Sequence, residues 1–161
     1  TNSINSYDLK NCENVRHCAT LDGFKDSYDC MFSAGPADHS YENIFAYGSN
    51  LLFNHDSANE NSHLIYCTTC HGCRDCFGCA NLKKAHNCVL NKPYSRNEYE
   101  KLCGKVIDHM SSTGEWGEFF HPSISAFGYN ESIACQYFPS EKSEIEKLGW
   151  NWIDRHEEKY S

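Results

Sequence analysis

The sequence predicts a mainly β fold, an irregular right-handed parallel β-helix (a β-solenoid) with a helical cap at its carboxyl end. Three observations support this prediction. Cysteines recur at every third residue in one run, the spacing of three other cysteines is repeated later in the chain, and a short phrase recurs through the first 92 residues. We expect residues 1–92 to form cysteine-rich coils and residues 93–161 to form a helical and aromatic cap packed on them.

The cysteine run lies in the segment YCTTCHGCRDCFGCANL. Its members are Cys67, Cys70, Cys73, Cys76 and Cys79. A constant step of three places these residues at equivalent positions of a repeating backbone. Such positions can form the inner wall of a coil, a metal site or a redox site.

The spacing of a second cysteine triplet helps to choose among these roles. Its separations match those of a later triplet: Cys12, Cys18 and Cys30 against Cys70, Cys76 and Cys88. In this alignment Val15 falls on Cys73 and Leu21 falls on Cys79. Valine and leucine cannot bind a metal, but they can fill an interior position, where a free cysteine behaves as a small hydrophobic residue. The substitutions therefore favour interior packing.

A recurring phrase indicates a solenoid. Its copies are SYDLKN from Ser6, SYDCMF from Ser27, SYENIF from Ser40, SHLIYC from Ser62 and AHNCVL from Ala85. Coils of a solenoid bury their apolar edges by stacking on their neighbours, and asparagine and aspartate between the phrases suit tight corners. We expect about four coils over residues 6–92. The alternative is a loop-rich domain held by metal, in which the repeat is coincidental.

The pattern changes after residue 92. Pro93 ends the last coil, and the segment Ser95-Arg96-Asn97-Glu98 is a capping box that begins a helix. The helix has one apolar face and stops at Gly114; that face holds Tyr99, Leu102, Cys103, Val106, Ile107 and Met110. An irregular aromatic stretch follows over 115–129, and Asn130 and Ser140 are expected to cap two short helices. Such a tail would cover the open end of the coils, where unpaired strand edges recruit other chains.

Three stretches within residues 67–154 resemble a family of cysteine-rich proteins known mainly from environmental bacterial sequences. The stretches are CRDCFGCANLKKAHNCVLNKPYSRNEYEKL, TGEWGEFFHPSISAFGYNESIACQYFP and LGWNWID. The family has no established activity, so the resemblance implies a domain and no function. Its members carry further zinc-ribbon cysteine pairs, which implies that this chain is a portion of a larger zinc-ribbon protein.

A metal site is the alternative role for the cysteine run. Cys67 and Cys70, together with Cys76 and Cys79, would supply four thiolates for a structural zinc. An iron–sulfur cluster fits less well, because the ferredoxin pattern needs three residues before its fourth cysteine and a proline after it. Cys79 follows after two residues and precedes Ala80. The expected cofactor is therefore none or zinc, and an interior cysteine ladder is favoured.

The remaining sequence favours a non-enzymatic structural or binding module over an enzyme. No phosphate loop, nucleophile elbow or His-Glu-x-x-His motif occurs, and Lys83-Lys84 is too short for a basic patch. The net charge of −8 argues against nucleic acid, and no apolar run is long enough for a membrane. We expect a protein or polymer partner on a solenoid face, with a homo-oligomer also compatible. The 11 cysteines, an odd number, favour free thiols in the cytoplasm.

Overall fold

The computed structural model describes residues 3–4, 15–16, 19–45, 48–57 and 60–154. Side chains are described from residue 26 onward, except those of residues 31–38. The chain forms two compact units, Thr1–Phe119 and Phe120–Ser161. The boundary therefore lies after Phe119 and not after residue 92, because the first helix and the loop that follows it belong to the unit of the coils. That residues 120–161 pack on the coils stays a prediction.

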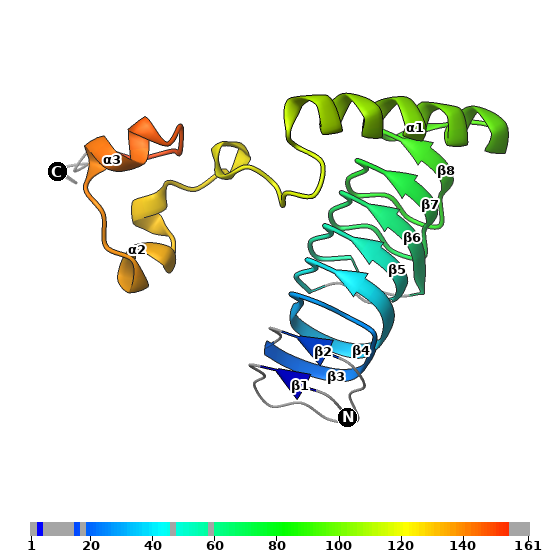
Figure 1. Cartoon of the computed structure of the whole chain (residues 1–161), viewed down its shortest axis with the longest axis horizontal. Coiled ribbons are helices and arrows are strands. Elements are labelled where there is room, and N and C mark those ends of the chain that lie inside the picture. Colours follow the sequence, from blue (N-terminus) through cyan, green and yellow to red (C-terminus); the bar gives the residue numbers. More distant parts are fainter. Residues whose placement is uncertain (1–2, 5–14, 17–18, 46–47, 58–59, 155–161) are drawn as a thin grey trace, which may run out of the picture. The chain divides into compact units, whose positions relative to one another are not determined.

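The first unit is a β-solenoid, which confirms the predicted fold class (Figure 1). One sheet has the order β3-β4-β5-β6-β7-β8-β9, in which all pairs are parallel except the antiparallel β8–β9. A separate parallel pair joins β1 (Ser3–Ile4) and β2 (Val15–Arg16). The strands of the large sheet are β3 (Ala19–Lys25), β4 (Met31–Tyr41), β5 (Gly48–Leu52), β6 (Asn61–Ile65), β7 (Arg74–Phe77), β8 (His86–Val89) and β9 (Lys92–Pro93).

A three-residue period governs the backbone of the coils. Every third residue from His63 to Leu90 has a positive φ, in the left-handed region. The residue after each of these corners up to Asn87 is buried or half-buried, as Cys67 after Tyr66 and Cys73 after Gly72. Left-handed backbone is easiest for glycine and is tolerated by asparagine and aspartate, which explains the frequency of these residues between the cysteines. The step of three in the cysteine run is therefore the period of the corners.

Neighbouring coils are also joined by backbone hydrogen bonds at corners that do not belong to the sheet. The amide of Thr69 donates to the carbonyl of His55 at 3.1 Å, and the amide of Thr68 donates to the carbonyl of Cys79 at 2.9 Å. Isolated parallel bridges on these sides join His55 to Thr68 and Thr68 to Ala80. Each coil is thus bonded to its neighbours on several sides, which offsets the cost of the left-handed residues.

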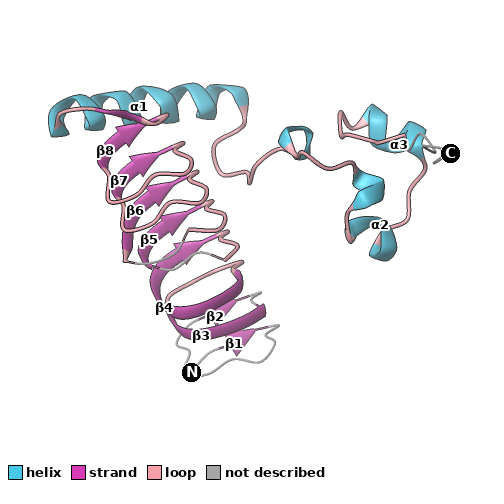
Figure 2. Ribbon diagram, turned by 180° about the vertical axis from the view of Figure 1, so that it is seen from behind, coloured by secondary structure: helices cyan, strands magenta, loops and turns pink. Residues whose placement is uncertain are grey.

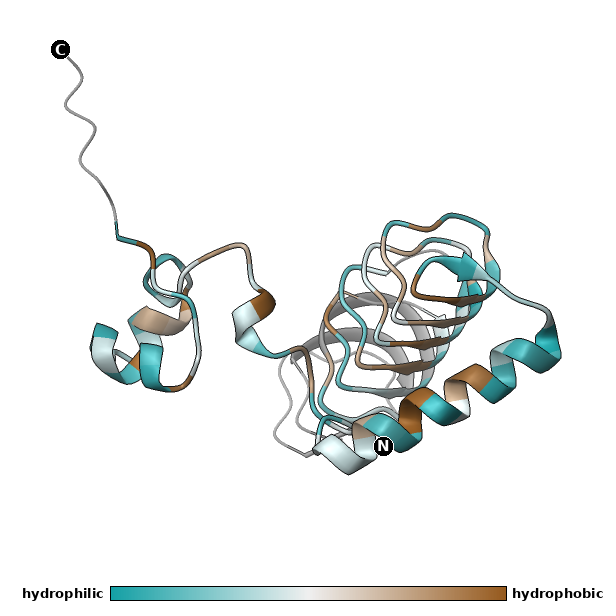
Figure 3. Ribbon diagram, turned by 90° about the horizontal axis from the view of Figure 1, so that it is seen from above, coloured by the Kyte–Doolittle hydropathy of each residue, from teal (hydrophilic) through white to brown (hydrophobic). Residues whose placement is uncertain are grey.

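The core is a narrow interior of stacked small side chains. The coils stack around this interior (Figure 3). One column of stacked residues runs through successive coils and is at most 1% exposed; its members are Cys30, Asn43, Asn54, Cys67 and Cys79. Cys30 therefore shares a column with Cys79. The sequence spacing had aligned Cys30 with Cys88. Cys88 instead lies in another column, where it stacks on Cys76, which stacks on Leu64.

Asparagine and cysteine exchange in this column because both satisfy the same backbone groups. The Asn54 Nδ2 donates to the carbonyl of Leu64 at 2.9 Å, and its Oδ1 accepts from the amide of Cys67 at 2.8 Å. Cys67 repeats the first contact one coil later, since its Sγ donates to the carbonyl of Cys76 at 3.4 Å. Cys79 repeats both, donating to the carbonyl of Cys88 and accepting from the amide of Asn91. The interior thiols are polar partners of the backbone as well as packing groups.

Helix α1 (Arg96–Thr113) lies across the end of the coils beside β8 (Figure 2). The capping box of Ser95 and Glu98 is present, and Gly114 closes the helix in the left-handed conformation, so both predictions are confirmed. Only Tyr99 and Cys103 are buried; the other expected apolar residues, Leu102, Val106, Ile107 and Met110, are half-buried. Burial raises the pKa of the Tyr99 phenol, and its hydrogen bond to Cys103 raises it further.

The loop after α1 packs on a stack of aromatic rings on the coils. The Trp116 ring centroid lies 6.1 Å from that of Phe53, 6.0 Å from that of Tyr66 and 6.4 Å from that of Phe77. The Tyr66 hydroxyl donates to the carbonyl of Glu118 at 2.9 Å and accepts from the amide of Gly117 at 3.2 Å. The beginning of the aromatic stretch therefore packs against the coils, as expected.

Within its described residues, 120–154, the second unit contains short helices and no strand. They are η1 (Pro122–Ile124), η2 (Tyr129–Glu131), α2 (Ala134–Tyr137) and α3 (Lys142–Lys147). Asn130 does not cap α2 as expected, because its amide oxygen and nitrogen instead bond the backbone of Ile153 at 3.0 and 2.8 Å. Glu141, not Ser140, precedes α3. Among the described residues, no helix is both long enough and apolar enough to cross a membrane.

The fold predicts how the chain responds to loss of its cap. A chain that ends at residue 94 loses α1 and the Trp116 loop, so the end of the coils becomes exposed. We expect this chain to aggregate or to form end-to-end oligomers in light scattering, because exposed strand edges pair with other chains. A chain that ends at Phe119 keeps the cap and serves as the control. Monomeric behaviour of the shorter chain, with an unchanged melting temperature, would show that α1 does not act as a cap.

The exchange of asparagine and cysteine predicts an order of stability at position 54. Asn54→Leu leaves the Leu64 carbonyl and the Cys67 amide buried without their partner, and we expect a loss of about 3 kcal/mol. Asn54→Cys keeps a donor and a weak acceptor in the same place, so its loss should be about half as large. Urea unfolding of both variants measures the difference. Equal losses would show that the column selects side chains by size alone.

Candidate functional site

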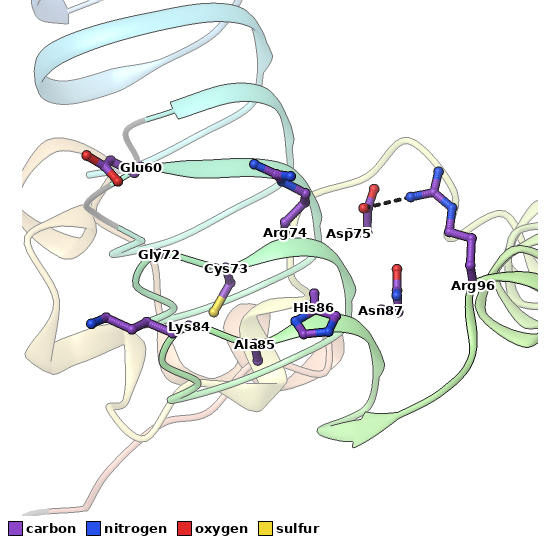
Figure 4. Close-up of a pocket in the computed structure, with 10 residues that line it drawn as sticks. All are labelled: Glu60, Gly72, Cys73, Arg74, Asp75, Lys84, Ala85, His86, Asn87 and Arg96. Carbon is purple, nitrogen blue, oxygen red and sulfur yellow. Dashed lines mark hydrogen bonds and ion pairs between the residues drawn. The ribbon is translucent and has the colours of Figure 1, made fainter.

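A groove lies at the starts of β7 and β8, with Glu60, which precedes β6, and Arg96 of α1 at its edges (Figure 4). Its volume is about 600 Å³. The residues that line it are Glu60, Gly72, Cys73, Arg74, Asp75, Lys84, Ala85, His86, Asn87 and Arg96. They come from three successive coils and the first turn of the helix, and most of them carry polar or charged side chains.

The register of the sheet places the side chains of this face in rows. Ser62 of β6 pairs with Arg74 of β7, which pairs in turn with His86 of β8. The Arg74 Nε donates to the Ser62 Oγ at 3.2 Å, so a neighbour in the same row orients the guanidinium. Neighbouring members of the row are separated by one strand spacing, about 4.8 Å.

A buried carboxylate joins the groove to the helix. Asp75 is only 8% exposed, and its Oδ2 accepts from the Arg96 Nη1 at 2.8 Å. Its Oδ1 lies 3.8 Å from the Nδ1 of His63. Arg96 also donates to Glu100 at 2.6 Å, one turn along α1. The ion pair compensates the charge of Asp75 and ties the helix to the wall of the groove.

The other charges of the groove are mostly positive. Within the described part of the chain, neither Arg74 nor Lys84 forms a salt bridge, and both side chains are exposed. Glu60 supplies a carboxylate at the edge of the group, away from Asp75 (Figure 4). A chain of net charge −8 thus gathers two uncompensated cations on one face.

Sequence reasoning missed this group because its members come from separate coils. Lys84 was visible only in the short pair Lys83-Lys84, and Arg74 only as a residue within the cysteine run. One sequence signal could have indicated the row: Ser62, Arg74 and His86 each lie two residues before a buried residue, so they occupy equivalent positions in successive coils. Without the coil lengths, that recurrence could not be converted into neighbours in space.

The expected metal ligands lie in the interior and not in the groove. Cys67, Cys70 and Cys76 are 0% exposed and Cys79 is 1% exposed. Cys67 and Cys79 are neighbours in one column, whereas Cys76 stacks between Leu64 and Cys88. The described neighbour of Cys70 in the preceding coil is Ser57 and not a cysteine or histidine. The Ser57 hydroxyl accepts a hydrogen bond from the amide of Cys70 at 3.3 Å. Among the residues that the structure describes, no three or more His, Cys, Asp or Glu side chains form a group that could hold a metal ion.

The interior thiols instead influence one another's ionisation. The Cys67 thiol interacts with the sulfurs of Cys70 and Cys79, which raises the pKa of Cys67 and lowers that of Cys70. The Cys76 thiol interacts in the same way with Cys79 and has a raised pKa. Burial raises the pKa of Cys73, which lies beside them. The thiols therefore form a connected chain inside the coils. Most of them have a raised pKa, because burial disfavours the thiolate and because a thiol that donates to a neighbouring sulfur is stabilised in its neutral form. The sulfurs that accept, those of Cys70 and Cys79, have a lowered pKa.

No family model, no curated protein and no solved structure matches the chain. The resemblance of residues 67–154 to the environmental cysteine-rich family is therefore not tested by these comparisons and stays a prediction. The zinc alternative for Cys67, Cys70, Cys76 and Cys79 likewise stays a prediction.

Cys73 distinguishes packing from metal binding, because it is fully buried and stacks between the Asn61 and Ala85 positions. If these cysteines fill the interior, Cys73→Val should cost less than about 1.5 kcal/mol in urea unfolding, as a volume-conserving substitution. Protein purified without an affinity tag should then contain less than one equivalent of zinc by mass spectrometry. Stoichiometric zinc in the purified protein would contradict the packing role, and its loss together with stability in the variant would show that Cys73 is itself a ligand.

Proposed function

We propose that this chain is a non-enzymatic binding module that holds an extended polymer against the polar face of its solenoid. The observation that carries the proposal is the repetition of polar side chains in register across β5–β8. One row contains Ser49, Ser62, Arg74 and His86, and the adjacent row contains Asn50, His63, Asp75 and Asn87. A row of polar groups at a constant spacing of about 4.8 Å suits a partner whose own groups repeat.

The position of this face favours a polymer other than an added peptide strand. Strand β7 is paired on both sides, with β6 and with β8, so its backbone hydrogen bonds are already made. Peptides that extend a sheet need an unpaired strand edge, which the middle of this sheet does not offer. Recognition on the face must therefore use side chains, and hydroxyl, amide, imidazole and guanidinium groups are the ones available there.

The interior supports a reducing compartment for this module. The described thiols of the ladder donate to backbone carbonyls, as Cys67 does to Cys76 and Cys70 does to Cys79. Oxidation would remove these donors from side chains that are fully buried. A cytoplasmic location, where thiols stay reduced, is therefore part of the proposal.

The proposal is tested by obstructing the face. Ser62→Trp places a large ring in the middle of the polar row, and we expect it to weaken binding to an array of neutral and acidic polysaccharides by about tenfold or more, equal to about 1.4 kcal/mol. His55→Trp, an exposed position on another side of the coils, is the matched control. Circular dichroism checks that both variants fold. Capture of peptides alone, or no capture of any polysaccharide by the unaltered chain, would refute the proposal.

A further inference from the structure

We infer that the groove at the starts of β7 and β8 binds carboxylate groups of an acidic polysaccharide, through Arg74 and Lys84. This inference rests on the proposed function, and it names the chemical class of the polymer.

The charges of the groove separate into a compensated part and an uncompensated part. Asp75 is paired with Arg96 at 2.8 Å and lies near His63, so this carboxylate contributes little net charge to the surface. Arg74 and Lys84 have no carboxylate partner in the described part of the chain. Glu60 alone opposes them. The groove therefore attracts an anion, although the chain as a whole is acidic.

The donors are placed to recognise a planar oxyanion. The Nε of Arg74 is occupied by Ser62, which fixes the plane of the guanidinium and leaves its terminal nitrogens for a ligand. Lys84 lines the groove from the next coil, and its side chain extends to the edge opposite Arg96 (Figure 4). His86 and Asn87 lie along the same wall, where they can bond the hydroxyl groups of a sugar (Figure 4). An arginine fork beside neutral donors matches a carboxylate carried on a sugar ring.

Two other anionic polymers fit this groove less well. Nucleic acid binding depends on many basic contacts along a dense row of phosphates, whereas the groove supplies two uncompensated cations on a chain of net charge −8. An acidic peptide would lack the strand edge that usually aligns it, since the strands of the groove are paired on both sides. A volume of about 600 Å³ accommodates a short stretch of sugar residues.

The test measures binding of the full chain to polygalacturonate, dextran, polyglutamate and oligothymidylate by calorimetry. We expect polygalacturonate to bind most tightly and more weakly at high salt. Arg74→Gln and Lys84→Gln should each weaken that binding about tenfold, since each removes a charge-assisted contact. Glu60→Gln removes the opposing carboxylate and should strengthen binding about threefold. Lys105→Gln, on the exposed part of α1, should leave the affinity unchanged.

Each contrary outcome has a definite meaning. The inference would be overturned if the Arg74→Gln and Lys84→Gln variants bound polygalacturonate as tightly as the unaltered chain, or if the unaltered chain bound polyglutamate or oligothymidylate more tightly than polygalacturonate. If the unaltered chain bound dextran as tightly as polygalacturonate, the role of charge would be overturned, and the proposed polymer-binding function would remain. Failure to bind either polysaccharide would overturn both.

Discussion

The left-handed corner at every third residue is the constraint on which the rest of the structure depends. Each corner turns the chain and directs the next side chain inward, as Thr69 does for Cys70. Because the turns recur after so few residues, the coils are small and the interior is narrow. The corners are costly for residues other than glycine, and they persist because neighbouring coils bond to the backbone on several sides.

The narrow interior decides which side chains the core can contain. The core cluster holds no side chain larger than leucine where the coils stack, and the tight corners leave inward carbonyls that need donors. Cysteine meets both demands, since it packs as a small hydrophobic group and its thiol donates to a carbonyl. Asparagine meets them at Asn43, Asn54 and Asn61, with stronger hydrogen bonds. Packing and hydrogen bonding thus give the buried cysteines of the described coils a structural role.

The same regularity builds the outer surface. Parallel pairing in register repeats each outward position one strand away, so side chains that are 12 residues apart in the sequence become neighbours, as Ser62 and Arg74 do. The helix that covers the end of the coils adds a second element to this face, because Arg96 reaches the buried Asp75. The groove therefore combines a repeated row with one fixed ion pair. Its positive charge comes from Arg74 and Lys84, which have no carboxylate partner in the described part of the chain.

Much of the fold could be read from the sequence, because its cause is local. The period of three, the recurring phrases and the capping box at Ser95 each reflect backbone geometry within a few residues, and they predicted the coils and helix α1. The column to which a residue belongs could not be read in this way. Coil lengths vary between eleven and thirteen residues, so Cys30 entered the column of Cys67 and Cys79 and not that of Cys88.

The candidate site was decided by the tertiary structure alone. Arg74, Lys84 and Arg96 are ordinary surface charges in the sequence, and only the stacking of coils and the docking of α1 bring them to one groove. Their grouping depends on register and on the ion pair with Asp75, which are long-range properties. What the sequence determined by itself was the repeating backbone and its inward positions, since those follow from the local preference of each residue for a corner or for the interior.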